Sequence, residues 1–119
     1  MSTPPTVLIV DDSRVFRTSV RRLLEAAGFR VVGEAGDGTS GVQAILRLRP
    51  DVVLLDVVLP DMTGFEVCDV LGQECPGSTV ILISTRDAST YRRRLRSSRA
   101  RGFLPKASLS GASVSALLR

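Results

Sequence analysis

Two short apolar runs that end in carboxylates constrain the fold of this chain more than any other feature. Residues 52–55 (VVLL) run without alternation into Asp56. Residues 6–10 (TVLIV) run in the same way into Asp11 and Asp12. Uninterrupted apolar runs of this length are typical of strands that are buried on both faces of a parallel sheet. Because parallel strands deliver their carboxyl ends to one edge, we expect the three carboxylates to converge there.

Helical and extended patterns alternate along the chain, which predicts an α/β fold with a five-stranded parallel sheet and five helices. Right-handed crossovers would place helices on both faces of the sheet. With a strand order of 2-1-3-4-5, the order reverses between the first and third strands, which carry the three carboxylates. The predicted strands are residues 6–10, 30–35, 52–55, 79–83 and 102–106, and the predicted helices are residues 14–27, 39–49, 64–73, 87–100 and 110–118.

Length and composition indicate one domain, residues 1–119, with a short N-terminal tail at residues 1–5. The sequence has no apolar run of membrane-spanning length and no signal peptide, so we expect a cytoplasmic protein without membrane contact. Cys68 and Cys75 fit no metal or redox spacing, and the chain has no histidine, so both are expected to be reduced thiols.

Three converging carboxylates require a cation. Two carboxylates about 4 Å apart repel by roughly 4 kcal/mol at an effective dielectric constant near 20. Carboxylate oxygens without histidine or cysteine ligands favour Mg²⁺. The predicted fourth and fifth strands end nearby in Ser84 and in Lys106, the only lysine among 16 basic residues. The sequence therefore predicts a magnesium site with a hydroxyl and an ammonium group beside it.

Such a site suits a phosphoryl group. Mg²⁺ and Lys106 would neutralise the phosphoryl oxygens, Ser84 would donate a hydrogen bond to one of them, and Asp56 would be the nucleophile that forms an acyl phosphate. The sequence contains neither a Walker motif nor a glycine-rich loop that opens a helix. The phosphoryl donor must therefore be another molecule.

The motifs together resemble the receiver (CheY-like) domain of bacterial two-component response regulators. They are the DD pair at 11–12, DVVLPDMTG at 56–64, ILIST at 81–85 and GFLPK at 102–106, and the resemblance extends from about Val7 to Leu118. It implies a flavodoxin-like, doubly wound sheet and assigns roles by position. Asp56 matches the phosphoacceptor, Asp11 and Asp12 the magnesium-binding pair, Val58 a backbone carbonyl ligand of the metal, Ser84 the switch hydroxyl, Lys106 the motif lysine, and Phe103 the aromatic residue that turns inward on activation.

The resemblance also implies partners. A sensor histidine kinase or a phosphotransfer protein would phosphorylate Asp56, and the face formed by the fourth helix and fifth strand would change. A homodimer through the fourth-helix, fifth-strand and fifth-helix face is expected. The domain itself would catalyse only its own phosphorylation and slow dephosphorylation. The KAS sequence at 106–108 is similar to the LuxR/NarL-type branch, whose members carry DNA-binding output domains.

Three positions depart from the usual family pattern: Thr85 stands where a small alanine is common, Ala107 where proline is common, and Phe103 where many relatives have tyrosine. The output also stays open. The chain is interpreted as the N-terminal regulatory part of a DNA-binding regulator, with no output domain present, and a stand-alone regulator that acts by protein contact is the alternative. A small Mg²⁺-dependent aspartyl-phosphate phosphatase and a flavodoxin-type electron carrier fit the motifs less well.

The arginine-rich segment 92–101 (RRRLRSSRAR) permits several interpretations. It lacks interleaved aromatic residues, which argues against direct binding of DNA by this chain. A solvated face is the usual role of such a run, and a contact surface for an acidic partner or a dimer mate is the functional alternative.

Overall fold

The two apolar runs form neighbouring central strands of a parallel five-stranded sheet with the order β2-β1-β3-β4-β5, so the predicted order is confirmed. The computed structural model describes residues 3–119. Residues 1–2 of the predicted tail lie outside the described residues, and residues 3–5 have no regular structure. The strands are β1 (Thr6–Val10), β2 (Arg30–Ala35), β3 (Val52–Asp56), β4 (Thr79–Ser84) and β5 (Gly102–Pro105).

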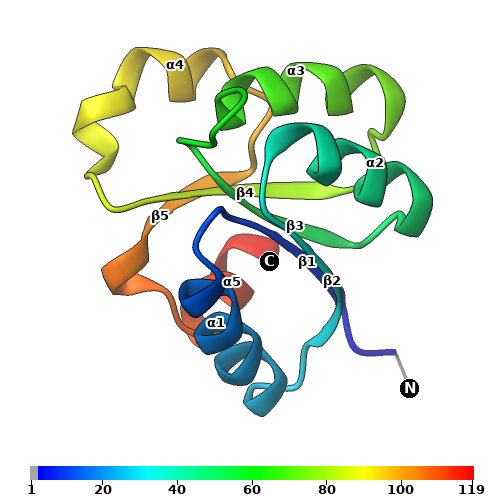
Figure 1. Cartoon of the computed structure of the whole chain (residues 1–119). Helices are drawn as coiled ribbons and strands as arrows, with labels where there is room; N and C mark the ends of the chain where they lie inside the picture. Colours follow the sequence, from blue (N-terminus) through cyan, green and yellow to red (C-terminus); the bar gives the residue numbers. More distant parts are fainter. Residues whose placement is uncertain (1–2) are drawn as a thin grey trace.

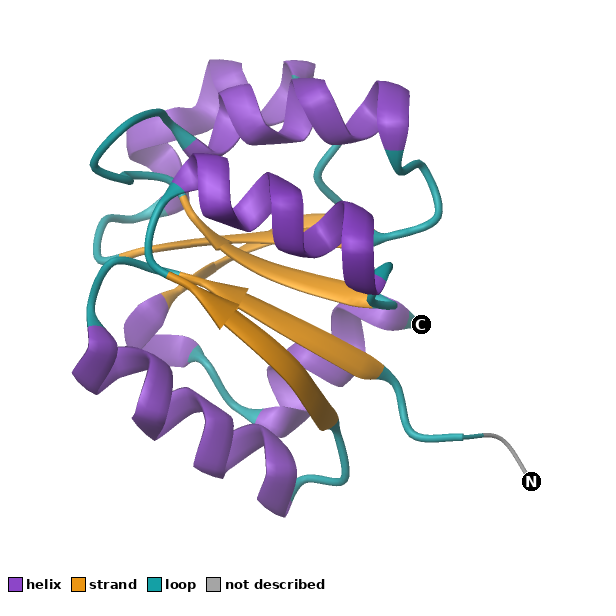
Figure 2. Ribbon diagram, turned by 45° about the vertical axis from the view of Figure 1, so that its right-hand side comes forward, coloured by secondary structure: helices purple, strands orange, loops and turns teal. Residues whose placement is uncertain are grey.

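Helices cover both faces of the sheet, as Figures 1 and 2 show. One layer holds α1 and α5, and the other holds α2, α3 and α4. The helices are α1 (Arg14–Ala26), α2 (Gly38–Leu48), α3 (Gly64–Glu74), α4 (Arg92–Ser97) and α5 (Gly111–Leu118), with short 3₁₀ turns η1 (Ala88–Tyr91) and η2 (Lys106–Ser108). Within residues 3–119, no helix has both the length and the apolar character needed to cross a bilayer.

The sheet divides the hydrophobic core into two clusters, one on each face. This explains why apolar and polar residues do not alternate along the central strands. Leu55 faces the cluster under α2 and α3, whereas Leu54 faces the cluster under α1 and α5. Both side chains are 0% exposed. Since successive side chains of a strand point to opposite faces, a strand covered on both sides must be apolar at every position.

Local signals fix the helix ends. The Ser13 hydroxyl accepts a hydrogen bond from the backbone N–H of Phe16 and caps α1, and Gly28 follows the helix with a φ of 93°. Positive φ is readily adopted only by glycine, so Gly28 ends this helix as the sequence predicts. Leu109 and Val114 lie in one cluster on either side of the Ser110 cap of α5.

The predicted helix at 87–100 is wrong in extent. The chain forms η1, then a short α4 that ends at Ser97. Tyr91 and Leu95 are the residues of these two elements that pack against the core cluster. Because tertiary packing supplies most of the stability of a helix, two such residues support only a short one. The Ser98 hydroxyl donates to the backbone carbonyl of Leu95 at 2.9 Å and competes with helical hydrogen bonding there. Similarly, β5 ends at Pro105, so Lys106 begins η2 rather than closing the strand.

Candidate functional site

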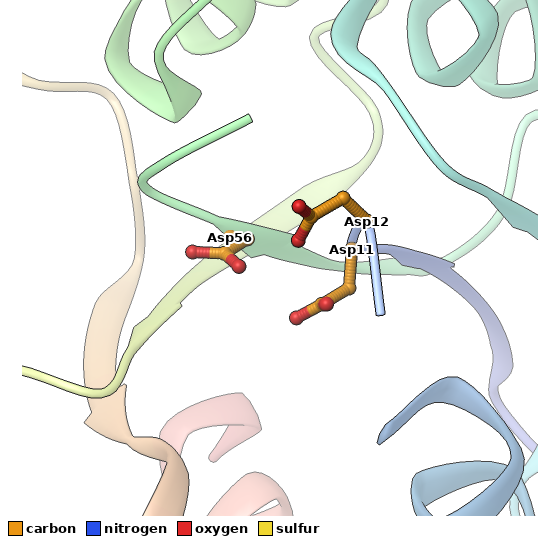
Figure 3. Close-up of side chains that lie close together, drawn as sticks. All are labelled: Asp11, Asp12 and Asp56. Atoms are coloured by element: carbon orange, nitrogen blue, oxygen red, sulfur yellow. The ribbon is translucent and has the colours of Figure 1, made fainter. Parts of the chain in front are cut away.

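The three predicted carboxylates converge at the carboxyl edge of the sheet. Asp11 and Asp12 follow β1, and Asp56 ends β3 (Figure 3). One carboxylate oxygen from each residue lies within 4.8 Å of the other two. Asp11 and Asp56 are 0% and 6% exposed, whereas Asp12 is exposed to solvent. The cluster is therefore open on the Asp12 side and dry on the other.

Lys106 pairs with two of these carboxylates. Its Nζ lies 2.6 Å from Asp11 Oδ2 and 2.9 Å from Asp56 Oδ2. It also lies 4.3 Å from the centre of the Phe16 ring, which adds a cation–π contact. Asp11 Oδ2 is buried and, among the described residues, has this ion-pair partner but no donor aligned for a hydrogen bond. An oxygen in this state can accept a further positively charged ligand.

Burial and neighbouring charges have opposite effects on the pKa values of Lys106 and Asp56. Burial disfavours the charge of Lys106, but its contacts with Asp11 and Asp56 outweigh this and raise the pKa of the ammonium group. Burial raises the pKa of the Asp56 carboxyl group, although the Val58 amide and Lys106 oppose that shift. The lysine therefore stays charged and partly offsets the effect of burial on the pKa of Asp56.

The loop after β3 is folded tightly around Asp56. The backbone N–H of Val58 donates to Asp56 Oδ1 at 3.0 Å, and a β-bridge joins Val58 to Thr63. The Val58 side chain points into solvent and is 62% exposed. A Cβ atom at Gly64 would lie 2.5 Å from the backbone carbonyl oxygen of Asp56, so the start of α3 needs glycine to come this close. The loop thus brings the Val58 backbone to the cluster.

Asp11 is held by a second set of contacts that the sequence did not reveal. The backbone N–H of Ser13 donates to Asp11 Oδ1 at 2.8 Å, and the guanidinium group of Arg17 donates to the Asp11 backbone carbonyl. Arg17 and Arg21 also bind Glu34 of β2 at 3.0 and 2.8 Å. Burial of Glu34 would raise the pKa of its carboxyl group, but Arg21 and Arg17 outweigh this and lower it. Nothing in the sequence indicates that Arg17 and Arg21 of α1 share a partner on β2.

Ser84 and Phe103 lie near the cluster but contact other groups. Ser84 is 2% exposed, and its Oγ accepts a hydrogen bond from the Arg86 backbone N–H at 3.1 Å. The same Oγ lies 3.3 Å from the hydroxyl oxygen of Tyr91. Phe103 is half-buried on β5, with its ring 6.1 Å from that of Tyr91. Thr85 is exposed.

The donor set fits a small divalent cation. Three carboxylates with hard oxygen atoms, one of them solvent-exposed, suit Mg²⁺, which keeps several waters of its own. The buried Asp11 Oδ2 supplies negative charge that is only partly compensated.

The predicted cysteine state is also found: Cys68 and Cys75 are free and buried, and burial raises the pKa of the Cys68 thiol to about 12.

Fold and site together define a small α/β domain with an acidic cluster where the strand order reverses. Three comparisons agree. NarP, the nitrate/nitrite response regulator of Escherichia coli (strain K12), is 39% identical over 106 residues, which cover 88% of this chain and 49% of that protein. The signal receiver domain of NarL from Mycobacterium tuberculosis has a TM-score of 0.86 and 34% identity over 98% of this chain and 95% of that chain. The CheX–CheY–BeF₃–Mg²⁺ complex from Borrelia burgdorferi has a TM-score of 0.82 and 27% identity over 97% of this chain and 87% of that chain.

The chain belongs to the response regulator receiver domain family, which its residues 7–117 match. The predicted family and the predicted similarity to the LuxR/NarL-type branch are therefore confirmed. Receiver domains of this family serve two-component signal transduction and are generally not catalytic enzymes. The family match favours a receiver domain over the phosphatase and electron-carrier alternatives. The chain spans about half the length of NarP.

Proposed function

We propose that this receiver domain accepts a phosphoryl group on Asp56 from a sensor histidine kinase or a phosphotransfer protein. The observation that carries the proposal is the pairing of one lysine with two converging carboxylates. Lys106 Nζ lies within 2.9 Å of both Asp11 and Asp56, at the point where the strand order reverses. Asp56 is thus a carboxylate with a fixed counter-charge at an edge of the sheet that is open to a donor.

Each residue has a defined part in the transfer. A carboxylate oxygen of Asp56 forms a bond to phosphorus while the bond from phosphorus to the donor imidazole breaks. The departing nitrogen takes the electron pair of that bond, and the other ring nitrogen keeps its proton, so the imidazole leaves neutral. Lys106 neutralises charge on the transferred oxygens, and Ser84 donates a hydrogen bond to one of them. A Mg²⁺ ion held by Asp11, Asp12, Asp56 and the Val58 backbone carbonyl would supply further charge neutralisation.

The proposal includes the output. Ser84 moves toward the phosphoryl group, Phe103 fills the space behind it, and the face formed by α4, β5 and α5 changes. This face would join two copies in a homodimer.

The chain would be a single receiver domain, residues 1–119 with the tail at 1–5, that regulates DNA binding through an output domain outside this chain. A stand-alone regulator that acts by protein contact is the alternative. The cytoplasm suits the two free thiols.

Intact-mass analysis after incubation with acetyl phosphate and Mg²⁺ tests the proposed acceptor. We expect one added phosphoryl group on the wild-type chain and none on Asp56→Asn or without Mg²⁺. Asp69→Asn is the matched control, because Asp69 is exposed on α3, outside the cluster, and should keep the adduct. An adduct that persists in Asp56→Asn would disprove the assignment. The absence of both an adduct and beryllofluoride binding in the wild-type chain would disprove phosphoacceptor function.

A further inference from the structure

The Ser84 hydroxyl has two neighbours, and neither belongs to the acidic cluster. Its oxygen accepts a hydrogen bond from the Arg86 backbone N–H at 3.1 Å and lies 3.3 Å from the Tyr91 hydroxyl. Within residues 3–119, it makes no hydrogen bond to Asp56 or Lys106. Ser84 is 2% exposed, so no bulk water competes for its hydroxyl. The Ser84 hydroxyl is therefore held by the Arg86 amide and by the hydroxyl of Tyr91, the residue that precedes α4.

The position of the Tyr91 hydroxyl is set by its ring. The ring lies 5.9 Å from that of Phe65 on α3 and 6.1 Å from that of Phe103 on β5, tilted by 58° and 54°. Tilted pairs at these distances are favourable arrangements for aromatic side chains. Tyr91 is thus held between two rings, and one of them is the aromatic residue assigned to the switch. Tyr91 is also the last residue of η1, directly before α4.

A serine hydroxyl has one proton to donate. Either hydroxyl can be the donor in the contact between Ser84 and Tyr91. A phosphoryl oxygen on Asp56 would need the Ser84 proton, and in either case the side chain must turn from Tyr91 to deliver it. The distance of 3.3 Å is long for a pair of hydroxyl groups, so this bond is weak and readily exchanged. Phe103 has no hydroxyl, so β5 offers Ser84 no such partner, whereas Tyr91 offers one from the α4 side.

We propose that Tyr91 is a positioning residue that holds the Ser84 hydroxyl toward α4 and competes with the phosphoryl group for it. This inference rests on the proposed function of Asp56 as phosphoacceptor. When Ser84 turns away, Tyr91 loses this hydrogen bond. Tyr91 directly precedes α4 and is one of the two residues of η1 and α4 that pack on the core cluster. The bond therefore couples occupation of the site to the position of α4.

Calorimetric titration with beryllofluoride at saturating Mg²⁺ tests the competition. Tyr91→Phe keeps the ring and removes the competing hydroxyl, so we expect roughly two- to fivefold tighter binding, the value of one weak hydrogen bond. In a Ser84→Ala background the same substitution should leave the affinity unchanged. Thr90→Val is the matched control, because Thr90 is exposed and its hydroxyl makes no hydrogen bond among the described residues.

Tyr91 also provides a direct signal, because the chain has one tyrosine and no tryptophan. We expect its fluorescence to change when beryllofluoride binds to the wild-type chain. Equal affinities of wild type and Tyr91→Phe, or the same gain in the Ser84→Ala background, would overturn the inference, as would binding heat without a change in tyrosine emission. Failure of the proposed function has another signature: the wild-type chain would then give no binding heat at all.

Discussion

At the scale of single residues, Lys106 is the most consequential side chain of the acidic cluster. It is the only lysine of the chain and, among the described residues, the only cation within 4.0 Å of the carboxylate oxygens of Asp11 or Asp56. Its side chain is 16% exposed, and those of Asp11 and Asp56 are 0% and 8% exposed. Buried carboxylates that lose their cation keep the cost of desolvation without the compensating attraction.

We therefore expect Lys106→Met to lower the free energy of unfolding by about 3 kcal/mol at neutral pH without added metal. Methionine preserves most of the side-chain length, so the loss reflects the missing charge. Urea denaturation measures it. Arg92→Met, which removes an exposed charge on α4, should change stability by no more than about 0.5 kcal/mol. Equal stability of Lys106→Met and wild type would show that the carboxylates do not need this cation.

At the scale of elements, the loop that carries Val58 is tied to the start of α2 through one carboxylate. Asp61 accepts hydrogen bonds from the backbone N–H groups of Gly38 and Thr39 at 2.7 and 3.0 Å, and from the Thr39 hydroxyl at 2.7 Å. These donors lower the pKa of Asp61 from 3.8 to about 2, with the Gly38 amide as the largest cause. The Asp61 carboxylate, which lies in the loop after β3, thus binds the free backbone N–H groups at the N-terminus of α2.

The stabilising effect of Asp61 should depend on pH. Because its pKa is lower in the folded chain, the effect is complete above the ordinary value of 3.8 and is lost as the pH falls toward about 2. We expect Asp61→Asn to lower the Tm by several degrees at neutral pH, with a gap that narrows below pH 4. Thermal unfolding followed by circular dichroism at several pH values measures this gap. A gap independent of pH would contradict the role of the charge.

The elements that could be predicted are those whose signal lies within the segment itself. β1 and β3 follow from uninterrupted apolar runs, and the acids that end them converge because the strands are parallel. The extent of α4 could not be predicted, because it depends on how few of its residues pack against the core. The partners of Ser84 and Asp61 could not be predicted either. Tyr91 and Thr39 reach them from other elements, and only the assembled fold sets those distances.

At the scale of the whole molecule, positive charge is in excess and unevenly compensated. The formal net charge is +4 at pH 7. Arg17 and Arg21 pair with Glu34, but none of the arginines of α4 forms an ion pair with a carboxylate side chain among the described residues. Arg94 instead stacks 4.4 Å from the centre of the Phe65 ring. Uncompensated like charges repel across the folded surface and reduce its stability.

Added salt should therefore stabilise the chain. We expect the free energy of unfolding to rise by roughly 0.5 kcal/mol from low ionic strength to about 0.15 M, where charges are screened beyond about 8 Å. Urea denaturation at the two ionic strengths measures the change. Replacing both Arg92 and Arg96, one helical turn apart, with Gln should reduce the salt effect. Stability that falls with salt would show that attractive pairs dominate instead.

The strand order has a consequence for how such a domain can diverge. The three carboxylates lie at the ends of β1 and β3, which are hydrogen-bonded on both sides. Phe103 instead lies on the edge strand β5, beside η1. Lys106 is the one residue of the cluster that depends on that edge. Substitutions on the outer surface of α4 and β5 can therefore accumulate and change which surface a partner meets, while the inherited carboxylates keep their geometry.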